Sequence, residues 1–162
     1  MSHPKKTEQG QTIIEILVVV TLTAVTFVGI LALSSLSIKS TGISRNQNIT
    51  SYYSYQAADW LRSAKDTYGW GAIVDKIQED AGASSSITYC LNTLPTDSNS
   101  FRALSPGPCL PDSTITETIF SRSVQMDLSE LSQDNLMAVI TTSWVDNTDA
   151  SSTIELKLGK TQ

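Results

Sequence analysis

Residues 10–38 decide the architecture of this chain, and they read GQTIIEILVVVTLTAVTFVGILALSSLSI. From Ile16 to Ile38 the stretch contains no formal charge and no proline. As an α-helix, those residues extend for about 35 Å, and the hydrocarbon core of a bilayer is about 30 Å thick. Valine and threonine are poor helix formers in water, but in lipid the backbone must satisfy its hydrogen bonds internally. The stretch therefore predicts a membrane-spanning helix over residues 11–38.

Polar segments flank the apolar stretch on both sides. The leader, residues 1–10 (MSHPKKTEQG), carries a basic pair, Lys5 and Lys6. Basic residues beside a membrane helix favour the cytoplasmic side. We therefore expect a cytoplasmic leader (1–10), a membrane helix (11–38) and an extracytoplasmic domain (39–162).

Helical spacing continues beyond the membrane segment, from Lys39 to Tyr68, and Gly42 is a plausible site of a bend. Apolar and aromatic residues recur there at intervals of three and four, which marks one face of a helix. We expect this face to pack on a sheet rather than to bind a cofactor, because aromatic stripes usually belong to a core. The face consists of Ile49, Tyr52, Tyr53, Gln56, Trp60, Ala64 and Tyr68.

The chain after Tyr68 is predicted to form loops and strands. Alternating apolar residues indicate half-buried strands, most strictly in the last segment. Residues 92–113 hold four of the five prolines, which predicts an irregular loop. The predicted fold class is α+β: a long N-terminal helix packed on about four antiparallel strands. The strands are expected at 86–91, 118–128, 136–145 and 153–158, with a turn over 146–151 before the last one.

The chain contains two cysteines, Cys90 and Cys109, which bracket most of the proline-rich loop. Two thiols are too few for a four-cysteine zinc site. In an exported domain such a pair indicates one disulfide, and two unpaired thiols are the alternative.

Composition narrows the classes of function. The formal net charge is -5, from 16 acidic and 11 basic residues, so the basic footprint of a nucleic-acid-binding protein is missing and no direct nucleic-acid binding is predicted. The single histidine, His3, lies outside the expected domain, which argues against His-based metal sites and catalytic triads. The run Asp146–Asp149 is compatible with a calcium loop, but turn chemistry explains it better. We expect neither enzymatic activity nor a cofactor.

Glu15 is the most informative single residue. A carboxylate beside a long apolar run is unfavourable unless it is paired or lies at the headgroup level. Cleavage after Gly10 would place a free ammonium group on Gln11, in the first turn of the helix. Glu15 could then neutralise the amine of a neighbouring subunit in an apolar bundle, and burying either charge alone would be expensive. The residue therefore suggests a role in assembly.

The run Gly10-Gln11-Thr12-Ile13-Ile14-Glu15 resembles the signal of type IV prepilins and pseudopilins, which has a basic leader, a glycine, a glutamate at this offset and a long apolar helix. Gln11 stands where the family usually has phenylalanine. The resemblance implies cleavage after Gly10 by prepilin peptidase, N-methylation of Gln11 and the role of the family's conserved glutamate for Glu15.

Weaker similarity to minor pilins and pseudopilins extends over Ala57–Asp66, Phe120–Val124 and Ser143–Asp146. The resemblance implies a subunit of a type IV pilus or of a related secretion or competence filament. The implied partners are other pilin subunits, prepilin peptidase and the assembly platform of the inner membrane. The implied location is the cytoplasmic membrane before assembly and the extracytoplasmic filament afterwards.

Two other interpretations remain open. In the first, the N-terminus is an ordinary secretory signal peptide cleaved near Ala32-Leu33-Ser34, although the apolar run exceeds the usual length of about 7–15 residues. In the second, an uncleaved single-pass anchor holds an extracytoplasmic binding domain. The first residue of the mature protein distinguishes these interpretations.

Overall fold

The computed structural model describes residues 9–110, 112–131, 134–146 and 148–160, with side chains described over 13–144 and 150–160 within these ranges. The chain forms two compact units, Met1–Ser44 and Arg45–Gln162. The leader residues Lys5 and Lys6 lie outside the described residues. Helix α1 (Gln9–Tyr68) begins in the first unit and ends in the second.

In the first unit, α1 is apolar around its whole circumference. Its large aliphatic and aromatic side chains from Ile13 to Ile38 are all exposed, between 47 % for Val18 and 75 % for Ile38. The hydroxyl groups of Thr21, Thr23, Thr26 and Ser34 donate to carbonyl oxygens three or four residues earlier; Thr21 Oγ1, for example, lies 2.9 Å from Val18 O. These internal bonds satisfy the hydroxyl groups without water. The helix is therefore long and apolar enough to cross a membrane.

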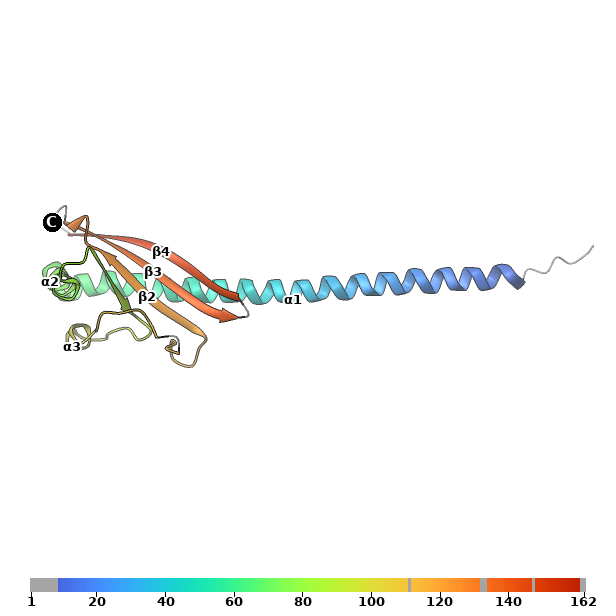
Figure 1. Ribbon diagram of the computed structural model, residues 1–162, viewed down its shortest axis with the longest axis horizontal. Helices are drawn as coiled ribbons and strands as arrows, with labels where there is room; N and C mark the ends of the chain where they lie inside the picture. The colour runs from blue at the N-terminus through green and yellow to red at the C-terminus, as the bar shows by residue number, and fades with distance from the viewer. Residues whose placement is uncertain (1–8, 111, 132–133, 147, 161–162) are drawn as a thin grey trace, which may run out of the picture. The chain divides into compact units, whose positions relative to one another are not determined.

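The second unit contains a four-stranded antiparallel sheet with the strands in chain order (Figure 1). The pairings Ile87↔Met126, Val124↔Ile140 and Ile140↔Ile154 align the apolar rows of adjacent strands. The predicted α+β fold is confirmed. The elements after α1 are α2 (Trp70–Ala81), β1 (Ser86–Cys90), α3 (Ser98–Arg102), β2 (Phe120–Asp127), β3 (Asn135–Asp146) and β4 (Thr148–Gly159).

One face of the sheet and the second part of α1 share a core. On β3, alternate residues from Leu136 to Trp144 are buried, while those between them are half-buried or exposed. β3 is an inner strand of the sheet, between β2 and β4, but only one of its faces is buried. Ser54 Oγ lies 2.7 Å from Thr142 Oγ1 and joins α1 to β3 directly.

The face of α1 that packs on the sheet differs from the predicted aromatic stripe. Tyr52 is 63 % exposed and Gln56 is also exposed, so they do not belong to the buried face. Small side chains occupy that face instead, because they allow the helix axis to approach the sheet closely. The buried residues of α1 are Thr50, Ser54, Ala57, Ala58, Leu61 and Ala64.

The region predicted as loops and strands contains two further helices. Helix α2 follows α1 after Gly69, whose φ of 84° lies in the left-handed region that favours glycine, and buries Ile73 and Ile77. Helix α3 interrupts the predicted loop over 92–113, and a capping box formed by Asp97 and Ser100 begins it. Reciprocal capping therefore stabilises a short helix within the segment 92–113, which its prolines predicted to be an irregular loop.

Two details of the prediction are corrected at α1 and at the last hairpin. Helix α1 continues without interruption through Gly42, because a single glycine weakens a helix without ending it. β4 begins at Thr148, with Asp146 paired to Thr148, so the predicted turn over 146–151 is wrong. The polar start of β4 lacks the apolar alternation on which the prediction depended.

Candidate functional site

The residues of the predicted processing site share one helix. Gly10, Gln11 and Glu15 all lie in the first two turns of α1, which begins at Gln9. Glu15 is exposed, and together with Ile16, Val19 and Val20 it lines an apolar depression of about 270 Å³ on the helix surface. Among the described residues, Glu15 has no ion-pair partner. A carboxylate thus lies on an apolar helix surface without a counter-charge from its own chain.

Cys90 and Cys109 form a disulfide, with an S–S distance of 2.09 Å and 4.7 Å between the Cα atoms. The bridge joins the end of β1 to the loop before β2 and confirms the predicted pairing. Gly107 N donates to Thr88 O at 2.7 Å just before the bridge, so this loop also follows the edge of β1.

Asn92 holds the bridged loop against β2. Its Nδ2 donates to the carbonyl oxygen of Ser113 at 2.7 Å, and its Oδ1 accepts from the backbone N–H of Arg122 at 2.7 Å. One side chain therefore satisfies backbone groups of two segments that have no ladder partner at that point.

Arg122 is buried between the sheet and α1, and it is 1 % exposed. Its Nε donates to Leu91 O at 2.9 Å, and its Nη1 donates to Tyr53 O at 2.7 Å and to Gln56 Oε1 at 3.0 Å. Burial lowers the pKa of the guanidinium to about 10, so it remains charged at neutral pH. The acceptors are neutral oxygens, and through them the Arg122 side chain connects β2 to α1 and to Leu91, the residue after β1.

A second polar network lies between α2 and β1. Lys76 Nζ donates to Asp80 Oδ2 at 2.8 Å and to Leu104 O at 2.9 Å, and Tyr89 Oη donates to the same Asp80 oxygen at 2.7 Å. Burial by itself would raise the pKa of Asp80, but the hydrogen bonds from Lys76 and Tyr89 lower it below its ordinary value. Burial, followed by the bond to Asp80, raises the pKa of the Tyr89 phenol. The network fixes α2 on the sheet.

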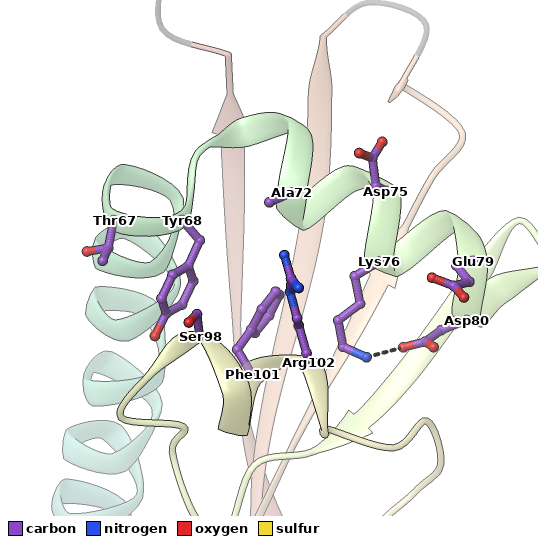
Figure 2. Close-up of a pocket in the computed structure, with 10 residues that line it drawn as sticks. All are labelled: Thr67, Tyr68, Ala72, Asp75, Lys76, Glu79, Asp80, Ser98, Phe101 and Arg102. Atoms are coloured by element: carbon purple, nitrogen blue, oxygen red, sulfur yellow. Dashed lines mark hydrogen bonds and ion pairs between the residues drawn. The ribbon is translucent and has the colours of Figure 1, made fainter.

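A cavity of about 590 Å³ lies beside this network, between the end of α1, α2 and α3 (Figure 2). Tyr68 and Phe101 stack on one side of it, with ring centroids 5.3 Å apart. Arg102 extends from α3 towards α2, while Asp75 and Glu79 project from α2. These three charged side chains have no ion-pair partner among the described residues, and they are of both signs. The cavity therefore does not favour one class of charged ligand.

No group of three His, Cys, Asp or Glu side chains within the described ranges is placed to hold a metal ion. The run Asp146–Asp149, whose sequence is compatible with a calcium loop, lies outside the described side chains.

The sequence identified the cysteines but not the two polar networks. Arg122 interrupts the apolar row formed by Phe120, Val124 and Met126 on β2, and a charged residue in such a row signals a buried polar group. Lys76 and Asp80 have the i, i+4 spacing of an ion pair on a helix. Because no helix was predicted over these residues, their spacing could not be interpreted as a pair.

Comparison with known proteins gives no relative: no family model, no curated protein and no solved structure matches this chain.

Proposed function

We propose that this chain is a non-enzymatic structural subunit, a minor pilin or pseudopilin, of a type IV pilus or a related secretion or competence filament. The observation that carries the proposal is the helix that begins at Gln9. Its apolar side chains from Ile13 to Ile38 are exposed on all sides, and Glu15 is the single carboxylate among them. An exposed apolar surface of this extent requires lipid or protein to cover it.

Proteolysis after Gly10 supplies the positive charge that pairs with Glu15 during assembly. Removal of residues 1–10 leaves the α-amino group of Gln11 at the start of the helix. In a bundle of such helices, the Glu15 carboxylate of one subunit pairs with the amine of a neighbour. Because an unpaired charge inside an apolar bundle is strongly unfavourable, this pair favours one axial register, while apolar contacts supply the attraction. The amine arises only after cleavage, so processing precedes ordered assembly.

The second unit is the part of the subunit that the filament displays. Its disulfide suits an oxidising extracytoplasmic compartment. The contacts of Arg122, on β2, to Tyr53 in α1 and to Leu91 just after β1 hold the helix on the sheet, which keeps the displayed surface in a fixed relation to the helix segment from Arg45 to Tyr68. A fixed arrangement of this kind suits a load-carrying subunit.

The decisive experiment is to determine the first residue of the mature protein. Intact mass and N-terminal sequencing of the chain from native cell envelopes are expected to give a start at Gln11, with an additional methyl group. A Gly10→Val variant should remain as a membrane-held precursor that retains residues 1–10. Gly29→Val is a matched control inside the same helix and should be trimmed normally, because a Cβ at Gly29 meets no atom within 4 Å.

A start near Ser35 identifies an ordinary signal peptide, and an intact leader on the native protein identifies a permanent anchor. Either result contradicts the proposal.

A further inference from the structure

The two edge strands of the sheet, β1 and β4, differ in whether another segment covers their outer backbone groups. The outer edge of β1 is closed by the bridged loop, because Gly107 N donates to Thr88 O and Tyr89 pairs with Pro106. The outer edge of β4 has no such cover from the described residues. One edge of a 12-residue strand is therefore available for pairing.

The register identifies which backbone groups face outward. Lys160 N donates to Asp134 O at 3.0 Å, which continues the β3–β4 pairing by one residue. In an antiparallel ladder, facing residues alternately exchange both hydrogen bonds or none. Even-numbered residues of β4 thus bond to β3, and odd-numbered residues direct their N–H and C=O groups outward. Those of Ser151, Thr153, Glu155 and Lys157 have no hydrogen-bond partner within the described ranges.

The first part of this edge lacks the features that usually prevent strand pairing. Natural proteins protect open edges with charged side chains, proline, bulges or very short strands. Residues 150–154 read Ala-Ser-Ser-Thr-Ile, and their pairing with β3 is regular. An unprotected edge of this kind indicates that another strand pairs with it.

Apolar surface lies beside the open edge. Lys65 Nζ donates to Gly159 O at 3.3 Å, so the flank of α1 that carries Lys65 faces β4. At about 100° per residue, Tyr55 lies about 80° further than Lys65 around the helix axis from the buried Ser54, on the side of α1 away from Tyr53, whose carbonyl oxygen accepts from Arg122. Tyr55 is 60 % exposed, and Ile154 on β4 is only partly buried. A strand added at this edge would cover both side chains.

The direction of β4 argues against a second copy as the antiparallel partner. Ser152 pairs with Thr142, which bonds to Ser54, whereas Gly159 bonds to Lys65, so β4 runs in the same direction as α1. Two copies joined antiparallel through β4 would direct their Arg45 ends in opposite directions. Subunits that all run in one direction along the proposed filament cannot adopt that arrangement.

We propose that β4 accepts an extended strand from a different protein subunit of the same filament, added antiparallel at its outer edge. This inference rests on the proposed function, since the partner is a neighbouring filament subunit. The strand has apolar side chains towards Tyr55 and Ile154, and a basic side chain opposite Glu155, which is exposed and has no ion-pair partner among the described residues. Main-chain hydrogen bonds supply the affinity, and the alternate side chains supply the specificity.

Hydrogen exchange of the full-length chain tests the proposal directly. The amides of Ser151, Thr153, Glu155 and Lys157 should exchange rapidly in the detergent-solubilised, purified chain. In the native cell-envelope fraction they should exchange at least about 100-fold more slowly, while the even-numbered amides remain slow in both samples. The same mass spectra report the first residue of the chain. A start other than Gln11 would contradict the pilin assignment, whereas unprotected odd-numbered amides would contradict the proposed strand pairing.

A proline at an outward position provides the matched variant. Thr153→Pro removes only an outward N–H and should leave the β3–β4 ladder intact, whereas Thr153→Val retains that N–H. We expect Thr153→Pro to abolish the protection of the neighbouring odd-numbered amides and to lower recovery in assembled filaments at least about tenfold, and Thr153→Val to behave as wild type. Both should retain the wild-type Tm within a few degrees.

Three results would overturn the proposal. The odd-numbered amides could exchange equally fast in the envelope and in detergent. Thr153→Pro could retain the protection seen in wild type. The purified chain could form a dimer that Thr153→Pro abolishes, which would assign the edge to a second copy.

Discussion

The Arg122 guanidinium donates a 2.7 Å hydrogen bond to the carbonyl oxygen of Tyr53, a residue 69 positions earlier in the chain. Because Arg122 also donates to Leu91 O, one buried cation on β2 is bonded to α1 and to the residue that follows β1. Within the described part of the chain, its hydrogen-bond acceptors are all neutral oxygens. The contact thus fixes α1 to the sheet through hydrogen bonds rather than through an ion pair.

Substitution of this residue should be strongly destabilising. Arg122→Met retains much of the apolar stem but removes the hydrogen bonds that the guanidinium donates to Leu91 O, Tyr53 O and Gln56 Oε1. We expect a loss of about 3 kcal/mol in the free energy of unfolding, measured by denaturant titration, since each bond to a charged group contributes about 1.5–3 kcal/mol. Arg102→Met is the control, because Arg102 is exposed and its side chain has no hydrogen-bond or ion-pair partner among the described residues; its unfolding midpoint should remain that of wild type. Equal unfolding midpoints for both variants would show that the hydrogen bonds of Arg122 do not stabilise the fold.

Asp80 should be a determinant of stability. Asp80→Asn retains the shape of the side chain but leaves the Lys76 ammonium, whose side chain is 11 % exposed, without its counter-charge. We expect a loss of about 2 kcal/mol at neutral pH. Asp59→Asn removes the exposed pair with Arg62 and should change stability little. Thermal melts of the two variants at pH 7 give the comparison, and a similar Tm for both would show that the network contributes nothing.

The same carboxylate should make stability depend on acid pH. The folded pKa of Asp80 is lowered, so its stabilising contribution is complete above the unfolded value of about 3.9 and is lost as the pH falls through the folded value. Denaturant titrations between about pH 2 and pH 5 should therefore show a steeper loss of stability for wild type than for Asp80→Asn. Parallel curves would exclude Asp80 as the titrating group.

Reduction of the disulfide should weaken the second unit. The bridge joins residues 19 positions apart, and closing a loop of this length stabilises a domain by about 3 kcal/mol in the chain-entropy model. The double variant Cys90→Ser/Cys109→Ser should lose about this amount, and a reducing agent should lower the Tm of wild type but not that of the variant. A native protein that is alkylated at both cysteines without prior reduction would contradict the bridge.

Glu15 should matter for assembly and not for processing. Glu15→Ala should be trimmed after Gly10 as in wild type but should enter filaments at a level reduced at least about tenfold, because the amine of its neighbour would lack a partner. Glu15→Asp keeps the charge on a shorter side chain and should recover part of the incorporation. The ratio of trimmed protein in the filament fraction to that in the membrane fraction is the measurement. Normal incorporation of Glu15→Ala would show that Glu15 does not set the axial register of the helices.

The pattern of apolar residues predicted those helices and strands that contain a clear apolar run or alternation. The uncharged run from Ile16 to Ile38 indicated a helix, and the alternation of Ile154, Leu156 and Leu158 indicated the last strand with its correct inward face. The start of β4 escaped because Ala150, Ser151 and Ser152 carry no apolar alternation. Helix α2 escaped because its apolar signal consists of only two core residues, Ile73 and Ile77, between Gly69 and Gly82.

The amino-acid sequence by itself determined the long apolar helix, the α+β class, the position of Glu15 and the pair of cysteines, because these depend on local composition and on short periodic patterns. Only the tertiary structure decided which side of α1 is buried. The predicted face included Tyr52, which is exposed, and Ala64, which is buried. Ala57, Ala58 and Leu61 occupy much of the observed face, since a helix lying close on a sheet leaves room for small side chains at its centre. The tertiary structure likewise decided the partners of Arg122 and the open edge of β4, because both depend on segments that meet only after the chain has folded.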